Sequence, residues 1–87
     1  AFSIFDKFPV SEGHALVIPK RHVSNYFELS FKEQMACWLM VNKVKTIINQ
    51  HFKVEDFNIG INIGSIAGQT IPHVHIHIIP RYKGDVE

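Results

Sequence analysis

The chain has 87 residues, of which 46% are hydrophobic and 20% are charged, so it has room for one hydrophobic core and none for a second domain. Nine lysines and arginines against eight acidic residues leave a formal charge of +1, which excludes the basic surface that a polymeric nucleic acid needs. The single cysteine, Cys37, cannot form an internal disulfide, and no apolar run approaches the roughly 18 residues that span a bilayer. We therefore expect one cytoplasmic domain over residues 1–87, without a membrane or nucleic-acid partner. Because the chain starts in mid-strand and ends without a stop signal, we expect it to be trimmed at both termini.

Two short apolar segments come first. Residues 1–5 and 14–18 are rich in β-prone side chains, and the turn-forming stretch at 9–13 separates them. The pattern predicts two strands joined by a loop, and Pro19 ends the second strand.

A long helix is predicted next. Ser30 and Glu33 fit a capping box, in which the hydroxyl and the carboxylate each accept a hydrogen bond from the other residue's backbone N–H. Apolar residues at helical spacing continue to residues 50–52 and comprise Phe31, Met35, Trp38, Val41 and Ile48, with Leu39, Val44, Ile47 and Phe52 widening the face. We interpret this face as packing on the core, with a dimer contact as the alternative for part of it.

Two further strands and a loop complete the chain. Residues 56–63 alternate, so Asn58, Gly60 and Asn62 share one face and leave space there. Residues 64–70 form a glycine-containing loop, and residues 73–80 read as a last strand that a proline stops. The order β-β-α-β-β predicts an α+β fold in which one long helix packs on an antiparallel sheet.

The last strand carries three histidines in alternation with apolar residues. His73, His75 and His77 share one face, about 6.6 Å apart between neighbours, while Val74 and its apolar successors face the core. Three interpretations follow for the row. It could be a solvated sheet face, a metal site in which two imidazoles and a third ligand bind zinc, or a nucleophilic histidine with two supporting neighbours. A row about 13 Å long cannot close all three rings on one ion, and no cysteine pair completes a shell.

The loop before the row favours an anionic electrophile. Gly64 and Gly68 permit a backbone conformation that turns several N–H groups inward as a phosphate nest. Gln69 and Thr70 add neutral hydrogen-bond donors beside the histidines. Nucleophilic attack on a phosphoryl group is therefore the interpretation that we favour.

Residues 62–81, NIGSIAGQTIPHVHIHIIPR, resemble the signature of the histidine triad (HIT) superfamily, His-φ-His-φ-His-φ-φ with φ apolar. The similarity extends upstream through residues 5–6 and 9–22, and so covers nearly the whole chain. The resemblance implies a nucleotide hydrolase or transferase that acts at the α-phosphate of a nucleotidyl conjugate. It also implies a homodimer whose sheets join across the interface.

The resemblance also implies a role for individual residues. His75 is the expected nucleophile that forms a nucleotidyl-histidine intermediate, which water hydrolyses, while His73 and His77 hold phosphate oxygens. A histidine that is largely neutral at pH 7 can attack phosphorus without a separate base. The remaining expected site residues bind the phosphoryl or leaving group, the ribose or the base, or support the triad; they are Gln69, Thr70, Gly68, Asn62, Asp6, Ile4, Phe5, Ile18 and His14.

The expected substrate is a diadenosine polyphosphate, as in the fragile histidine triad-like branch. The alternatives are an aminoacyl- or amine-adenylate phosphoramidate, and a catalytically silent nucleotide-binding regulator. We expect no cofactor, apart from a divalent cation that accompanies the polyphosphate. In some bacterial members a histidine equivalent to His22 joins the first triad histidine and an upstream Cys-x-x-Cys in a structural zinc site. The 87 residues contain no such cysteine pair, so we expect structural zinc only if missing N-terminal residues carry one.

Overall fold

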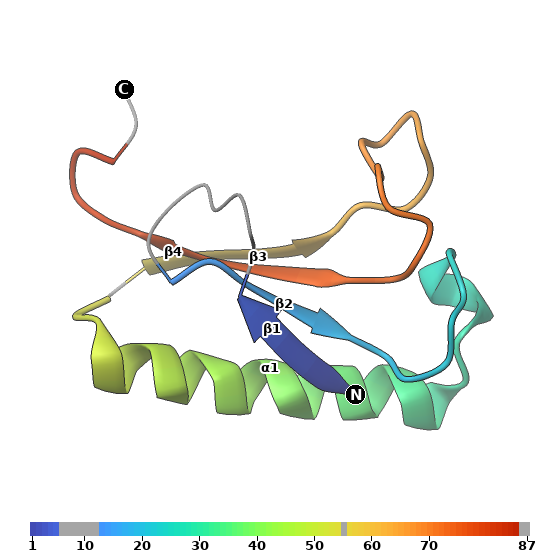
Figure 1. Ribbon diagram of the computed structural model, residues 1–87, viewed down its shortest axis with the longest axis horizontal. Helices are drawn as coiled ribbons and strands as arrows, with labels where there is room; N and C mark the ends of the chain where they lie inside the picture. The colour runs from blue at the N-terminus through green and yellow to red at the C-terminus, as the bar shows by residue number, and fades with distance from the viewer. Residues whose placement is uncertain (6–12, 55, 86–87) are drawn as a thin grey trace.

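A computed structural model describes residues 1–5, 13–54 and 56–85. It has strands β1 (Phe2–Phe5), β2 (Ala15–Ile18), β3 (Asp56–Ile61) and β4 (Ile76–Arg81), a short 3-10 helix η1 (Tyr26–Glu28), and helix α1 (Phe31–His51). All strand pairs are antiparallel and the sheet order is β1-β2-β4-β3. Helix α1 lies along one face of this sheet (Figure 1), which confirms the predicted α+β architecture.

Helix α1 begins where the capping box predicts. The Ser30 hydroxyl accepts a hydrogen bond from the Glu33 N–H at 3.2 Å, and the Glu33 carboxylate accepts one from the Ser30 N–H at 2.8 Å. The same carboxylate forms a two-bond ion pair with Arg21, which ties the end of β2 to the start of the helix. The Arg21 hydrogen bonds, followed by that from Ser30, lower the pKa of Glu33 to about 2.

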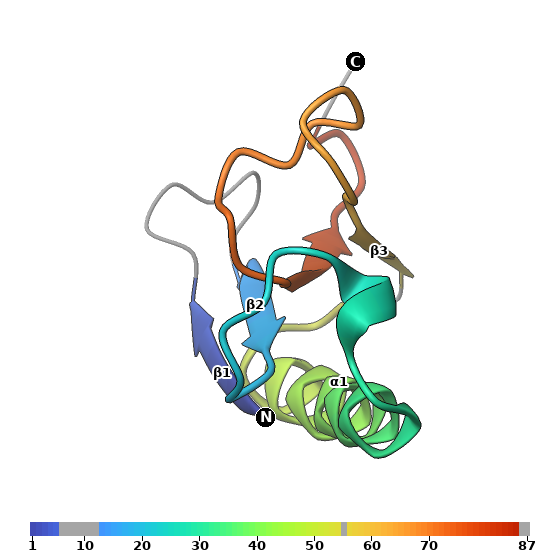
Figure 2. The ribbon, with the colours of Figure 1, turned by 90° about the vertical axis from the view of Figure 1, so that its right-hand side faces the viewer.

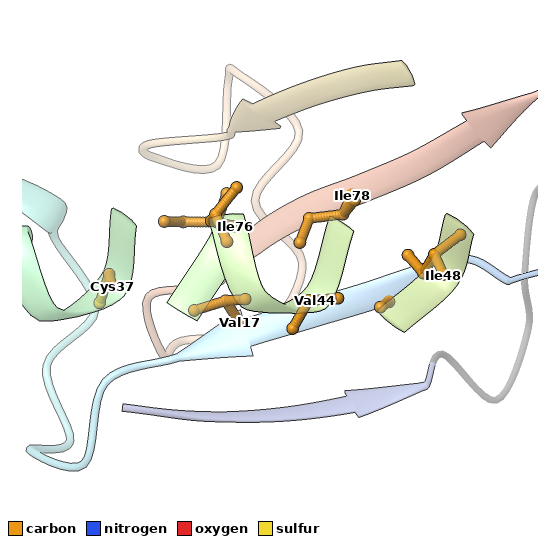
Figure 3. Close-up of a cluster of buried hydrophobic side chains, with 8 residues drawn as sticks. Val17, Cys37, Val44, Ile48, Ile76 and Ile78 are labelled. Carbon is orange, nitrogen blue, oxygen red and sulfur yellow. The ribbon is translucent and has the colours of Figure 1, made fainter. Parts of the chain in front are cut away.

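The core lies between α1 and the sheet. Figure 3 shows Val44 and Ile48 of the helix against Val17 of β2 and against Ile76 and Ile78 of β4. These five side chains are at most 5% exposed, so the apolar set of the last strand faces the helix as predicted.

The buried stripe of α1 is narrower than the sequence suggested. It consists of Cys37, Val41, Val44 and Ile48, which follow helical spacing. Several of the apolar residues predicted to pack inward are exposed instead, namely Phe31, Met35, Trp38, Leu39 and Ile47. Because a single four-stranded sheet covers only one side of a helix, the wide apolar face exceeds what this fold can bury.

Two strand boundaries differ from the prediction. Strand β3 ends at Ile61 instead of residue 63, and β4 begins at Ile76 instead of residue 73 and continues through Pro80. Residue 74 donates its N–H to the Val23 carbonyl at 2.8 Å, so the first two histidines lie in a segment that bonds to the coil after β2. Pro80 is tolerated because the β2–β4 pairs end at Ile78, and β4 has a ladder partner on one side only at that point.

The register assigns side chains to the two faces of the sheet, because residues directly opposite each other share a face. Leu16, His77 and Gly60 lie opposite one another across three strands. We call their side, which is turned away from α1, the triad face. Figure 2 shows the loop between β3 and β4 on this side and the helix on the other. Within the described residues, no helix is long and apolar enough to cross a lipid bilayer.

Candidate active site

His75 and His77 form the centre of the site. Their ring centroids are 4.8 Å apart and the rings meet edge to face. His75 is 7% exposed, and His77 is partly buried on β4. The tight spacing follows from alternation, since residues two apart on extended backbone project to the same side.

One hydrogen bond determines the proton arrangement of His75. Its Nδ1 lies 2.8 Å from the carbonyl oxygen of His73. A carbonyl only accepts, so Nδ1 carries the hydrogen, and in the neutral ring Nε2 then holds a free lone pair. The fold thus leaves one nitrogen of this buried ring with an available lone pair.

The first triad histidine is held differently. The Nε2 atom of His73 donates to the Pro19 carbonyl at 3.1 Å, and its ring stacks on the ring of His22 with centroids 4.5 Å apart. The sequence predicted three evenly spaced imidazoles on one strand. In the structure, His77 on β4 and His75 just before it form an edge-to-face pair. The ring of His73 is instead hydrogen-bonded to the carbonyl of Pro19, just after β2.

A fourth histidine adjoins the pair. His14 is 3% exposed, and its Nε2 lies 3.4 Å from Nδ1 of His77. One of the two nitrogens must carry the hydrogen, so the tautomers of the two rings are coupled. This position agrees with the supporting role that the resemblance suggested for His14.

A groove of about 320 Å³ opens beside this pair. It is lined by His14, Asn58, Ile59, Gly60, Asn62, His77 and Ile79. A side chain at Gly60 would meet nothing within 4 Å, which confirms the space predicted on this face. Asn58 and Ile79 are lining residues that we did not single out, although the alternation of β3 had placed Asn58 on the open face.

The glycine loop uses four of its backbone N–H groups for hydrogen bonds within itself. Gly64 and Gly68 both have φ of +92°, as a tight turn requires. However, the backbone N–H groups of residues 67, 68 and 69 bond to carbonyls within the loop, and that of Gly64 donates to Oε1 of Gln69 at 2.8 Å. These four donors close the loop and could face an anion only if those bonds opened, whereas the hydrogen bonds say nothing against the N–H groups of residues 65, 66 and 70.

The amide of Gln69 is also fully engaged. While Oε1 accepts from Gly64, Nε2 donates to the carbonyls of Ser24 at 2.7 Å and Ile71 at 3.1 Å. Gln69 therefore fastens the loop to the segment that precedes η1. To donate to a phosphoryl group, as the sequence suggested, it must exchange one of these bonds. Thr70 lies beside it on the surface.

The apolar residues expected to contact a base lie on different faces. Ile4 and Ile18 are on the triad face, where Leu16 and Phe2 accompany them. Phe5 pairs with Ala15 on the helix side of the sheet and lines a pocket against α1. By this register Phe5 does not share the face on which Ile4 and Ile18 lie. Alternation along a strand separates neighbouring residues in this way. Asp6 lies outside the described residues.

The described residues do not assemble a metal centre of the bacterial type. No group of three or more histidine, cysteine or acidic side chains among them is placed to hold an ion. His22 and His73 each direct Nε2 to a carbonyl, and burial in the core raises the pKa of the Cys37 thiol. The described residues alone therefore supply no complete zinc shell, and we derive no step through such an ion.

Comparison with known proteins assigns this arrangement to a family. Residues 1–84 match the HIT domain. The chain belongs to the HIT family. Bis(5'-adenosyl)-triphosphatase of Dictyostelium discoideum is 40% identical over 87 residues, which are 100% of this chain and 58% of that protein. The asymmetrical bis(5'-nucleosyl)-tetraphosphatase of Schizosaccharomyces pombe is 47% identical over 77 residues, or 88% of this chain and 42% of that protein.

A solved HIT structure shares the fold closely. The crystal structure of the Caenorhabditis elegans NitFhit protein superposes with a TM-score of 0.94 and 40% sequence identity, covering 98% of this chain and 21% of that one. The chain therefore spans about half the length of the curated HIT relatives, and a smaller part of the fusion protein.

Proposed function

We propose that the protein is a nucleotide hydrolase or transferase that cleaves nucleotidyl conjugates at the α-phosphate, with His75 as the nucleophile. The observation that carries this proposal is the 2.8 Å hydrogen bond from Nδ1 of His75 to the His73 carbonyl. It leaves Nε2 unprotonated in the neutral ring, which a nucleophile requires. The names of the diadenosine triphosphatase and tetraphosphatase relatives support the same reaction class.

The proposed reaction has two steps. In the first, the Nε2 lone pair bonds to the α-phosphorus as the bond from phosphorus to the leaving-group oxygen breaks. In the second, water attacks the phosphorus, the P–N bond breaks, and a nucleoside monophosphate leaves with neutral His75 restored. Splitting the displacement in this way replaces one difficult attack by two easier ones.

The neighbouring groups are proposed to hold the phosphoryl oxygens. His77 lies 4.8 Å from His75 between ring centroids, and its ring also contacts His14. Together with Thr70, His77 can stabilise charge that develops on the oxygens, and His73 joins them when its Nε2 releases the Pro19 carbonyl. Asn62 lines the groove, Gly68 lies close to the Asn62 amide, and Gln69 joins the set if it releases Ser24 or Ile71.

The proposed substrate is a diadenosine polyphosphate, which yields AMP and a second nucleotide. We place the base against the apolar side chains of the triad face, Ile4 and Ile18, to which the structure adds Leu16 and Phe2. The second candidate is an adenosine phosphoramidate, which the amide of Asn62 beside His77 favours. Turnover of diadenosine triphosphate and of an amine adenylate under identical conditions distinguishes the two, and a faster rate on the phosphoramidate contradicts our choice.

Replacement of the nucleophile tests the mechanism. His75→Ala removes the attacking nitrogen, so we expect turnover to fall by at least about a thousandfold and acid-labile labelling of the protein by a radiolabelled nucleotide to disappear. His51→Ala is the matched control, because that exposed histidine bonds only to the Ile47 carbonyl at the end of α1. Labelling that persists in His75→Ala would falsify the covalent role. A wild-type rate no higher than that of His75→Ala indicates a catalytically silent nucleotide-binding regulator instead.

We further propose a cytoplasmic homodimer that needs no cofactor of its own. The buried free thiol of Cys37 fits a reducing compartment. A divalent cation is proposed to arrive with the polyphosphate as part of the substrate. The test is the activity on a substrate without a polyphosphate chain after a chelator has removed divalent cations. A loss of that activity contradicts the proposal that the cation belongs to the substrate.

A further inference from the structure

The segment after β2 and the segment before β4 meet at one end of the molecule (Figure 1). His22 lies at their contact, because its ring stacks on His73 and its Nε2 bonds to the Pro72 carbonyl. The rings of His22 and His73 are stacked, with centroids 4.5 Å apart and planes inclined by 24°. An exposed residue outside the triad thus covers one face of the first triad imidazole.

Two reciprocal hydrogen bonds accompany the stack. The Nε2 atom of His22 lies 3.2 Å from the Pro72 carbonyl, and that of His73 lies 3.1 Å from the Pro19 carbonyl. Both nitrogens must carry hydrogens, because carbonyl oxygens only accept. The bond to Pro19 holds one atom of the His73 ring but still permits the ring plane to turn. Stacking on His22 restricts that plane.

The same contact holds the peptide bond that prepares the nucleophile. The peptide between His73 and Val74 donates its N–H to the Val23 carbonyl at 2.8 Å, and its carbonyl accepts from Nδ1 of His75 at 2.8 Å. The direction of this carbonyl determines which nitrogen of His75 is protonated. A shift of the His73 segment away from residues 22–23 therefore disturbs the nucleophile without any contact to it.

We propose that His22 is a positioning residue for the reaction. By stacking on His73 it holds that imidazole and the following peptide in the orientation that keeps Nε2 of His75 free. The stack and its two hydrogen bonds to carbonyls form from the described residues alone. The kinetic part of the test rests on the proposed function, whereas the spectroscopic part does not.

Three substitutions separate stacking from hydrogen bonding. His22→Phe keeps a flat ring over His73 but loses the bond to Pro72, His22→Gln keeps a donor but no ring, and His22→Ala keeps neither. On diadenosine triphosphate we expect kcat to fall about tenfold in His22→Ala and His22→Gln with KM changed less than twofold, and His22→Phe to stay within about twofold of wild type. His51→Ala serves as the histidine control.

Imidazole nitrogen NMR spectra of the free proteins report the tautomers directly. We expect wild type and His22→Phe to have His75 protonated at Nδ1 and His73 at Nε2, and His22→Ala to show mixed tautomers. Wild-type tautomers in all three variants overturn the proposal even if the protein has no hydrolase activity. It is also overturned if His22→Phe is as impaired as His22→Ala, or if the purified protein holds one equivalent of metal whose removal reproduces the His22→Ala defect.

Discussion

At the scale of single residues, Gly68 connects the loop to the groove. Its φ of +92° suits glycine, and a Cβ at this position would lie 3.0 Å from Nδ2 of Asn62. The absence of a side chain at Gly68 therefore lets the loop approach an amide that lines the groove. The lack of a Cβ at Gly68 thus permits both the backbone conformation of the loop and its close approach to Asn62.

We predict that Gly68→Ala impairs activity as well as stability. The left-handed backbone costs about 1 kcal/mol for alanine, and the new methyl group must displace Asn62. We expect kcat/KM to fall several-fold in steady-state assays. Gly84→Ala is the matched control, because Gly84 has φ of +82° but would meet nothing within 4 Å. Equal kinetic effects of the two substitutions would show that the contact with Asn62 is unimportant.

At the scale of elements, the ion pair between Arg21 and Glu33 joins β2 to α1. The carboxylate accepts from the Arg21 guanidinium at 2.9 and 3.0 Å while it also caps the helix. Arg21 additionally donates to the Glu28 carbonyl at 2.8 Å, so η1 is held by the same side chain. The segment that carries His22 and Val23 leaves the sheet at this junction.

This junction should make stability depend on acid pH. Since the pKa of Glu33 is lowered to about 2 from the ordinary 4.5, its stabilising contribution is complete above pH 4.5 and is lost as the pH falls toward 2. We expect Glu33→Gln to lower the melting temperature at pH 7 by more than it does at pH 2.5. Glu28→Gln, which removes a carboxylate from the preceding turn, is the control in thermal melts. A melting difference that stays constant between the two pH values contradicts the assignment.

At the scale of the whole molecule, one side of α1 remains apolar and uncovered. Phe31 is 76% exposed and Leu39 59%, and Met35 and Trp38 lie between them along the helix. Strand β3 is also an edge of the sheet. An exposed apolar face of this size suits a second copy of the chain, because its burial removes apolar surface from water.

We predict that this face forms the homodimer contact. Leu39→Lys places a charge in the centre of the face and should shift the protein from dimer to monomer in sedimentation equilibrium at micromolar concentration. Lys43→Ala, one helical turn further on, is the control and should leave the dimer intact. A wild-type protein that is monomeric at these concentrations, or a Leu39→Lys variant that dimerises equally well, refutes the contact.

The sequence by itself determined the elements and faces that depend on neighbours along the chain. Helix α1 and its cap at Ser30 and Glu33 follow from local hydrogen bonding and a 3.6-residue period, and the separation of His75 and His77 from Ile76 and Ile78 follows from alternation. Recognition of the HIT signature also needed only this pattern.

Only the tertiary structure decided how the site is held together. The turn of His73 toward Pro19 and His22 and the hydrogen bond from Gln69 to Ser24 are contacts between segments far apart in the chain. The closure of the glycine loop is also a tertiary outcome, since four of its backbone N–H groups bond within the loop while Gln69 ties it to Ser24. Periodicity specifies which side of a strand a residue occupies, but the partner of a hydrogen-bonding group depends on which distant segment packs beside it.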